Sequence, residues 1–331
     1  MVERGAMALV RYAVRTDLAE LTPGDKILVA CSGGADSVAL TLALVKEAAL
    51  LAISVQAITI DHGLQTASAS RATETAQWLR DIGCDRVSAV KVEVGSVGGI
   101  EAAAREARYS ALEKEASKTK SVAIYLGHSM DDQAESVLLG LGRGSGPRSI
   151  AGMERVSGGY RRPLLGLRRR QLRAACIEVN APSWDDPHNE DERFTRVGLR
   201  KLMPTLEATL GGGVVEALAR TADLLREDLS ALDLLTAQIV EVAGFADRTE
   251  VEVSELVHLP TAVRTRVLRG MALRAGVPTG SLTFNHLTRM DSLITSWRGQ
   301  GGVALPGELT FSRKSGRLSF SSTRRVERGS R

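Results

Sequence analysis

The residues from Ala30 to Ser37 read Ala-Cys-Ser-Gly-Gly-Ala-Asp-Ser and bring together two glycines, two serine hydroxyl groups and a carboxylate. An apolar stretch that predicts a strand precedes them, and one that predicts a helix follows. Backbone N–H groups at the start of such a helix bind phosphate oxygens, and glycines let the backbone approach them closely. We therefore predict a phosphate-binding loop made of Ser32, Gly33, Gly34, Ala35, Asp36 and Ser37.

Asp36 is the informative residue of this loop. A carboxylate among phosphates is useful where it holds Mg²⁺ or positions a group that attacks near the phosphate. The loop lacks the G-K-[ST] of a Walker A motif and does not match G-x-G-x-x-G. The alternative is a plain structural turn, in which Asp36 is the N-cap of the following helix.

Two further polar clusters follow predicted strands. Asp61 and His62 end the second predicted strand, and the segment Gly127–Glu135 leaves the fourth. Ligands of open parallel sheets bind outside the carboxyl ends of the strands, so the loop and both clusters predict one crevice. His62 alone is more typical of a structural histidine, whereas for His128 we favour a function.

Asp132 and Glu135 lie three residues apart, on one face of the helix predicted after His128. Acids in a first turn favour the N-terminus of a helix. The same pair can hold a cation or a substrate amine, and the sequence leaves these alternatives open.

The elements that position these residues alternate between strand and helix. Strands are predicted over residues 26–30, 53–60, 86–94 and 121–126, and helices over 36–50, 67–82, 100–118 and 131–141. This alternation predicts an α/β fold with a parallel sheet covered on both faces. The segment Gly142–Pro147 is Gly-rich and predicts a mobile loop, which leads into a basic connection.

The second half of the chain reads as mainly helical. Helices are predicted over 194–203, 205–243, 260–275 and 283–296, followed by a hairpin of Val303–Leu305 and Leu309–Phe311 that Leu318–Phe320 closes. A chain of 331 residues is long enough for two domains. We expect a first domain over residues 1–204 and a smaller one over 205–331.

Composition excludes several classes of protein. Hydrophobic residues make up 44% and charged residues 25%, which excludes disorder as the main state. The apolar stretch Val38–Val45, which only Thr41 interrupts, is too short to span a membrane. The three cysteines are far apart, which argues against disulfides and thiolate metal sites. The N-terminus lacks a signal-peptide pattern, so we expect a cytoplasmic protein.

Positive charge is concentrated in two zones. The chain has 43 basic and 39 acidic residues, a net charge of +4, but Arg143–Arg173 contains nine arginines and one acid. The segment Ser312–Arg331 contains seven basic residues and one acid. Such zones predict a local footprint for a polyanion. The alternative is a set of basic loops that keep the surface soluble.

The ordered set of motifs resembles a known family. The loop Ser32–Ser37 is similar to the PP-loop of the N-type ATP pyrophosphatases, and the chain is similar to the tRNA(Ile)-lysidine synthetase family over residues 26–204. The residues that carry this resemblance are Asp61–Leu64, Glu101, Arg105, Arg108, Tyr109, His128–Glu135, Arg162–Leu165 and Asp186–Asn189 with the stretch to Arg200.

The resemblance implies a PP-loop ATPase domain (adenine nucleotide alpha hydrolase-like) and a mainly helical domain that binds tRNA and ends in a hairpin. It implies that ATP and Mg²⁺ adenylate C2 of the wobble cytidine in the CAU anticodon of an isoleucine tRNA. Free L-lysine then displaces AMP to form lysidine. Its ATP-binding residues would be the PP-loop with Asp61 and His62, with Asp36 near Mg²⁺. Its catalytic residues would be Asp36, His128, Asp132, Glu135, Arg196 and Arg200.

Two departures from the family pattern stand out. Ser129 replaces the second histidine of a common His-His pair, and Arg196-Val-Gly-Leu-Arg200 replaces the common Arg-Asn-x-x-Arg. The alternatives are another PP-loop tRNA-modifying enzyme such as a 2-thiolase, a small-molecule amidotransferase, and a nucleotide-regulated RNA-binding module. The oligomeric state is open, and a homodimer is one alternative.

Overall fold

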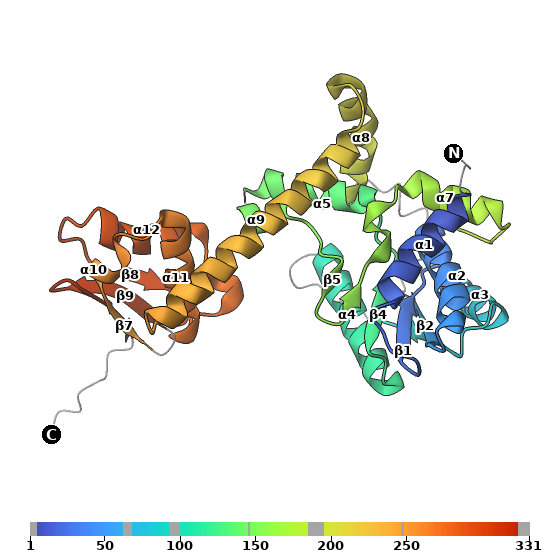
Figure 1. Cartoon of the computed structure of the whole chain (residues 1–331), viewed down its shortest axis with the longest axis horizontal. Coiled ribbons are helices and arrows are strands. Elements are labelled where there is room, and N and C mark those ends of the chain that lie inside the picture. Colours follow the sequence, from blue (N-terminus) through green and yellow to red (C-terminus); the bar gives the residue numbers. More distant parts are fainter. Residues whose placement is uncertain are drawn as a thin grey trace. The chain divides into compact units, whose positions relative to one another are not determined.

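The computed structural model describes residues 5–61, 68–92, 100–144, 146–184, 195–245 and 248–323. It divides into two compact units (Figure 1). The first unit comprises Met1–Gly142 and Gly152–Ala222, and the second comprises Arg143–Ala151 and Asp223–Arg331. Each unit is built around its own β-sheet.

The sheet of the first unit has the strand order β3-β2-β1-β4-β6-β5, and only β5 runs antiparallel to its neighbour. This confirms the predicted parallel sheet. Ala30 at the end of β1 pairs with Ile58 in β2 and with Leu126 in β4, which brings the carboxyl ends of the three strands to one edge. The strands are β1 (Lys26–Ala30), β2 (Ser54–Asp61), β3 (Arg86–Lys91), β4 (Ala123–Leu126), β5 (Val156–Ser157) and β6 (Tyr160–Arg161).

Helices cover both faces of this sheet. One face packs against the first group of helices around a core that includes Leu40, Leu44 and Tyr125, and the other packs α4 through Leu112 and Ala116. Strands buried on both faces consist of continuous apolar runs, which is why β1 and β4 could be predicted. The first group is α1 (Ala6–Leu18), α2 (Ala35–Leu50), α3 (Ser68–Asp81) and α7 (Arg169–Glu178), and α4 is Ile100–Thr119.

Three more helices pack around a smaller cluster in the first unit. Ala134, Met203, Val214 and Val215 form its centre. The helices are α5 (Met130–Arg143), α8 (Thr195–Leu210) and the first part of α9 (Val214–Val242). The single helix predicted over 205–243 is wrong at residues 211–213, where three consecutive glycines with positive φ separate α8 from α9.

The second unit joins helices to a four-stranded antiparallel sheet of order β7-β10-β9-β8. Phe245, Leu268, Met290 and Phe311 are buried in its core. The predicted hairpin is confirmed as β8, β9 and β10, and the short β7 adds an edge that the prediction lacked. The elements are α6 (Pro147–Ile150), β7 (Glu250–Glu252), α10 (Val253–Leu256), α11 (Thr261–Arg274), α12 (Phe284–Thr295), β8 (Val303–Leu305), β9 (Leu309–Lys314) and β10 (Arg317–Ser322).

The region around Gly142 also differs from the prediction. Helix α5 continues through Arg143, and α6 begins at Pro147, so the loop predicted over Gly142–Pro147 is too long. Pro147 occupies the first helical position, where the missing N–H of proline costs no hydrogen bond. The basic connection that follows contains β5, β6, a 3₁₀ turn (Pro163–Gly166) and α7.

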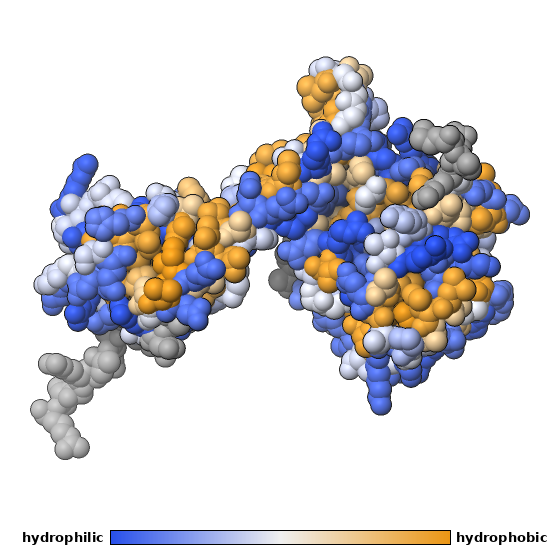
Figure 2. Space-filling view, viewed as in Figure 1, coloured by the Kyte–Doolittle hydropathy of each residue, from blue (hydrophilic) through white to orange (hydrophobic). Residues whose placement is uncertain are grey.

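Hydrophilic residues and smaller apolar patches share the face of each unit drawn in Figure 2. Such mixing is normal for a folded surface, because polar groups are too few to cover it. No helix within the described residues is long and apolar enough to cross a bilayer.

Candidate active site

The loop between β1 and α2 folds around the hydroxyl of Ser37. The N–H of Ser32 donates to this oxygen at 3.1 Å, and the hydroxyl donates to the carbonyl of Gly34 at 2.9 Å. Gly33 has φ +83, and a Cβ there would lie 3.0 Å from Oγ1 of Thr75. Gly34 is the N-cap of α2, so the alternative that Asp36 caps the helix is wrong. The loop keeps the form of a phosphate cradle at a helix N-terminus.

A cavity of about 490 Å³ opens beside this loop. Gly127 at the end of β4 lies so close to α2 that a Cβ there would be 3.1 Å from the backbone of Asp36. This close approach joins the loop to the segment that begins α5. The predicted site residues that border the cavity are Ser32, Gly34, Ala35, Asp36, Ser37, His128, Asp132 and Arg200.

Asp36 is a partly compensated carboxylate. Its Oδ2 accepts a hydrogen bond from Nε of Arg169 at 3.4 Å, whereas its buried Oδ1 has no hydrogen-bond partner among the described residues. Burial and the neighbouring charge of Asp132 raise the pKa of Asp36 to about 7, against the opposing effect of Arg169. The carboxylate is therefore ready to gain a cation.

His128 is a neutral imidazole at this site. Burial, together with the positive charges of Arg108 and Arg162, lowers its pKa to about 3, against the attraction of Asp132. Its Nδ1 is buried without a hydrogen-bond partner in the described part of the chain. The ring can therefore donate or accept a hydrogen bond to a ligand rather than act as a cation.

Asp132 bonds to the start of α5 and to an arginine. Its Oδ2 accepts from the N–H and hydroxyl of Ser129 at 2.8 and 2.7 Å, which caps the start of α5. Its Oδ1 accepts from Nη2 of Arg169 at 2.7 Å. Burial opposes the charge of Asp132, but Arg169, His128 and the bonds from Ser129 outweigh it and hold its pKa below the ordinary value.

Glu135 is 2% exposed and anchors two arginines. Its Oε1 accepts from Nη1 of Arg169 at 3.3 Å and from Nε of Arg200 at 3.1 Å, while its buried Oε2 has no partner among the residues described. Arg196 does not border the cavity; its Nη2 is 3.5 Å from Oγ of Ser136. The predicted pair of arginines is thus divided between the cavity and the side of α5.

Arg169 is the central residue that the sequence reasoning missed. Its N–H donates to Asp131 at 2.7 Å, and its guanidinium forms ion pairs with Asp36, Asp132 and Glu135. The available signal was the run of three arginines shortly after the motif that begins at Arg162. Four further arginines border the same cavity, namely Arg108, Arg170, Arg173 and Arg200.

The basic zone Arg143–Arg173 is therefore not a uniform surface for a polyanion. Arg161 forms ion pairs with Asp17 and Glu20, and Arg162 is 7% exposed. These two side chains are bound within the first unit, whereas other arginines of the zone face the cavity.

Other predicted residues lie apart from the cavity. Asp61 is buried at the end of β2 and does not border it, and Gly33 borders a second cavity on the other side of the loop. His62 and Asp186–Asn189 lie outside the described residues. Within the described ranges, no three His, Cys, Asp or Glu side chains form a metal-binding group. Mg²⁺ in nucleotide sites needs only one or two carboxylates besides phosphates, so Asp36 with its unpartnered Oδ1 fits that ion.

Comparisons with known proteins agree with this geometry. A family model described as a PP-loop domain matches residues 10–206, and one described as a TilS substrate binding domain matches residues 252–319. A U34-tRNA thiolase, NcsA from Methanococcus maripaludis, shares the fold with a TM-score of 0.55 and 16% identity, over 67% of this chain and 80% of the thiolase chain. The fold and the loop therefore define a PP-loop protein.

Three relatives share much more sequence, and each is a tRNA(Ile)-lysidine synthase. The Streptomyces coelicolor protein is 52% identical, over 88% of this chain and 84% of its own. The Thermobifida fusca protein is 48% identical, over 94% and 96%. The Mycobacterium tuberculosis protein is 49% identical, over 86% of both chains. The chain belongs to the tRNA(Ile)-lysidine synthase family.

Proposed function

We propose that this protein is a ligase that joins free L-lysine to C2 of the wobble cytidine in the CAU anticodon of an isoleucine tRNA, in the cytoplasm. ATP adenylates the C2 carbonyl oxygen, and pyrophosphate leaves. The ε-amine of lysine then attacks C2, its proton passes to the protein or solvent, and AMP leaves. The observation that carries the proposal is the arrangement of the loop, His128 and Asp132 around one arginine-lined cavity.

The first step needs positive charge around the phosphates of ATP. The backbone N–H groups of the loop and the arginines that border the cavity supply this positive charge. One guanidinium group can donate two parallel hydrogen bonds to a phosphate. Mg²⁺ bound between Asp36 and the phosphates would neutralise charge on the leaving pyrophosphate. Neutral His128 can donate a hydrogen bond to a phosphate or carbonyl oxygen without repelling the neighbouring arginines.

The second step needs a place for lysine beside the adenylated base. A smaller cavity of about 200 Å³ shares Arg169 and Arg200 with the first one, and Asp131, Glu135 and Glu207 border it. This volume suits one amino acid: the three acids would face its ammonium groups, and Arg168, Arg169 and Arg200, which border the same cavity, would face its carboxylate. Carboxylates that attract the ε-ammonium can also accept the proton that must leave before the nitrogen attacks.

We propose that residues 205–331 bind the body of the tRNA. Arg289, Arg298 and Lys314 are exposed on the second unit, and such side chains contact RNA phosphates. Residues 324–331, which include four arginines, lie outside the described residues.

The alternative of a 2-thiolase is less well supported, because the cysteines are engaged in the fold. Cys176 donates to the carbonyl of Ala35, and Cys31 lies 3.6 Å from the hydroxyl of Ser37. Burial raises the pKa of Cys176 to about 11 and that of Cys84 to about 12, so both are thiols at neutral pH. Sulfur transfer and cluster binding use thiolates.

The test measures pyrophosphate release from ATP and Mg²⁺ with an isoleucine tRNA that carries CAU, with and without each amino acid. We expect release that depends on the tRNA, together with transfer of labelled lysine alone. Release without lysine transfer would contradict the proposal and favour a thiolase-like reaction. Tight tRNA binding without any release would favour a binding module.

Asp132→Asn separates the two steps. Asp132 borders the larger cavity, which shares Arg169 and Arg200 with the smaller one, so its charge would act on the ε-amine where that amine meets the adenylated base. The amide of the variant keeps an oxygen that can cap α5 but removes this charge, so we expect pyrophosphate release within about threefold of the wild type and lysine transfer reduced at least about 30-fold. Rapid-quench assays of both products measure this. Equal loss of both products would contradict the assignment of Asp132 to the lysine step.

A further inference from the structure

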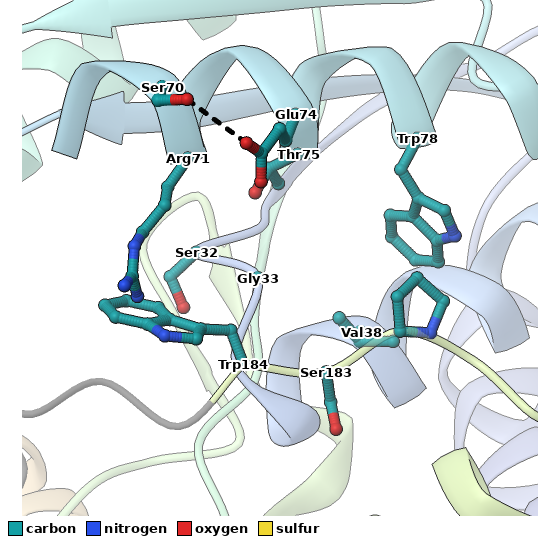
Figure 3. A pocket seen from close by; sticks show the side chains of 11 residues that line it. Ser32, Gly33, Val38, Ser70, Arg71, Glu74, Thr75, Trp78, Ser183 and Trp184 are labelled. Carbon is teal, nitrogen blue, oxygen red and sulfur yellow. Dashed lines mark hydrogen bonds between the residues drawn. The ribbon is translucent and has the colours of Figure 1, made fainter. Parts of the chain in front are cut away.

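A second cavity borders the loop on its other side, with a volume of about 510 Å³. It lies between α3 and the segment 182–184, and both Ser32 and Gly33 border it (Figure 3). None of the steps proposed above uses it. Its walls are chemically unlike those of the first cavity, because they include two indole rings, Trp78 and Trp184.

Trp184 is held in place by the loop itself. Its backbone N–H donates to the carbonyl of Gly33 at 3.0 Å, and the residue borders both cavities. The guanidinium carbon of Arg71 lies 3.4 Å from the centre of the Trp184 ring, a stacked cation–π contact. The indole is therefore fixed both by its backbone and by one face of its ring.

Arg71 has an unused hydrogen-bond donor. Its Nη1 is buried and has no hydrogen-bond partner among the described residues. A buried donor without a partner costs free energy, and a charged donor costs more than a neutral one. An anionic group of a ligand at this edge of the cavity would supply the partner that the protein does not.

Trp78 borders the cavity two helical turns further along α3. Figure 3 shows Arg71 and Trp78 projecting from the same side of the helix toward the segment 182–184. A ligand that fills the space between them meets an apolar ring surface at one end and a cation at the other, and the wall also contains the carboxylate of Glu74, which accepts from the hydroxyl of Ser70. Nucleotides of single-stranded RNA have this character, since their bases stack on aromatic rings and their phosphates bind arginine.

ATP itself does not satisfy this pattern. The loop backbone and the arginines of the first cavity take its phosphates, so its adenosine end has no anion left for Arg71. We propose that the second cavity binds an unpaired nucleotide of the RNA substrate other than the modified cytidine, with its base against the indoles and its phosphate on Arg71. This inference rests on the proposed function, because it takes RNA as the substrate.

The test measures binding of an anticodon-arm RNA hairpin to the full chain, without ATP or lysine, so that no turnover is needed. Trp78→Leu removes a ring but keeps apolar volume, Arg71→Gln removes the cation, and Arg80→Gln on the exposed side of α3 is the matched control. Stacking on an aromatic ring contributes enough for us to expect about tenfold weaker binding with Trp78→Leu and with Arg71→Gln. Binding by Arg80→Gln should be unchanged.

A series of hairpins, each with one loop base removed, identifies the nucleotide. At one position other than the wobble cytidine, removing the base should weaken RNA binding by the wild type about tenfold. The Trp78→Leu variant, which already binds more weakly, should bind that abasic hairpin no more weakly than the intact one. Unchanged binding by both variants, or the same loss with every abasic hairpin, would overturn the proposal. Weaker ATP binding with unchanged RNA binding would overturn it too, in favour of adenine.

The outcomes separate the two proposals. A wild-type protein that shows this base-specific binding but transfers no lysine would contradict the proposed function and leave the nucleotide site standing. A protein that makes lysidine normally but shows no base-dependent effect of either variant would retain the function and lose the site. Arg71→Gln keeps the inference testable if Trp78→Leu disturbs folding, because Trp78 packs against the hydrophobic core whereas Arg71 is not part of that cluster.

Discussion

Each unit contains an arginine that pairs with carboxylates, buried in the second unit and partly buried in the first, and the two arrangements differ in how completely their atoms are satisfied. In the second unit, Arg264 donates to both oxygens of Asp291, to the carbonyl of Leu259 and to the hydroxyl of Thr261. In the first unit, Arg169 is shared among three acids. Two of those acids, Asp36 and Glu135, each keep a buried oxygen without a partner among the described residues.

The difference distinguishes a structural ion pair from a site. A buried pair contributes to stability only when its remaining hydrogen-bonding positions are filled, as they are around Arg264. Unfilled positions lower stability and are retained where a ligand fills them. The cluster at Arg169 also borders two cavities, whereas the pair at Arg264 lies in a packed core.

The largest expected effect follows from removing Asp36, one of the two acids with an unpartnered oxygen. Asp36→Ala should reduce pyrophosphate and AMP formation at least about 100-fold, because it removes charge at the reacting phosphate. It should leave the thermal unfolding temperature unchanged or higher, since it removes the buried Oδ1 that has no partner among the described residues. Near-normal AMP release would contradict the role of Asp36. Asp25→Ala, on an exposed turn before β1, is the control for activity.

The fully hydrogen-bonded pair of Arg264 and Asp291 should show the opposite response. Arg264→Ala removes the guanidinium and leaves Asp291 uncompensated, so we expect the free energy of unfolding to fall by about 3–5 kcal/mol in urea titrations. Arg317→Ala is the control, since its ion pair with Glu252 is exposed and should contribute little to stability. Similar losses of unfolding free energy in the two variants would contradict the distinction between the buried pair at Arg264 and the exposed pair at Arg317.

The pH dependence of stability should reveal Asp36. Its pKa is raised from 3.8 to about 7 in the folded protein, so folding favours its protonated form. This contribution is complete below the unfolded value and is lost as the pH rises from about 4 to about 7. Relative to Asp36→Asn, the wild type without ATP should lose about 1–3 kcal/mol of unfolding free energy between about pH 5 and pH 8. Parallel pH profiles of the two proteins would contradict the raised pKa.

The smallest effect concerns the cap of α5. Ser129→Ala removes the hydroxyl that bonds to Asp132, and loss of such a cap costs about 1 kcal/mol. Ser136→Ala, about two turns later, should cost less because its hydroxyl bonds to the carbonyl of Asp132 within the helix and to Arg196, and caps no helix end. Calorimetric unfolding of both variants measures the difference, and a larger loss for Ser136→Ala would refute the capping role.

Apolar runs and glycines in the sequence predicted the helices and strands whose bounds depend on neighbouring residues alone. Lys26–Ala30 is a strand and the following helix starts one residue before the prediction, because apolar runs and the glycines between them define both. Helix α1 was missed although Met7, Val10, Val14 and Leu18 show helical spacing. Strands β5, β6 and β7 have two or three residues each, so pairing partners rather than composition define them.

The site was predictable to a similar degree. Asp36, His128 and Asp132 could be found because they follow the carboxyl ends of neighbouring strands in a parallel sheet. Arg169 could not be assigned, because its partners lie in α2 and α5, far away in the sequence. The unpartnered Nη1 of Arg71 likewise depends on a segment more than one hundred residues further along the chain.

The single guanidinium that serves three acids also constrains how this sequence can change through evolution. Losing Arg169 would leave three neighbouring carboxylates to repel one another, and neutralising one acid would not restore the cluster. Residues coupled in this way do not contribute independently. The effect of changing several of them together therefore differs from the sum of the effects of the single substitutions. We therefore expect positions 36, 132, 135 and 169 to be conserved together. A descendant in which one of them changes would have to change the charges of the other three as well.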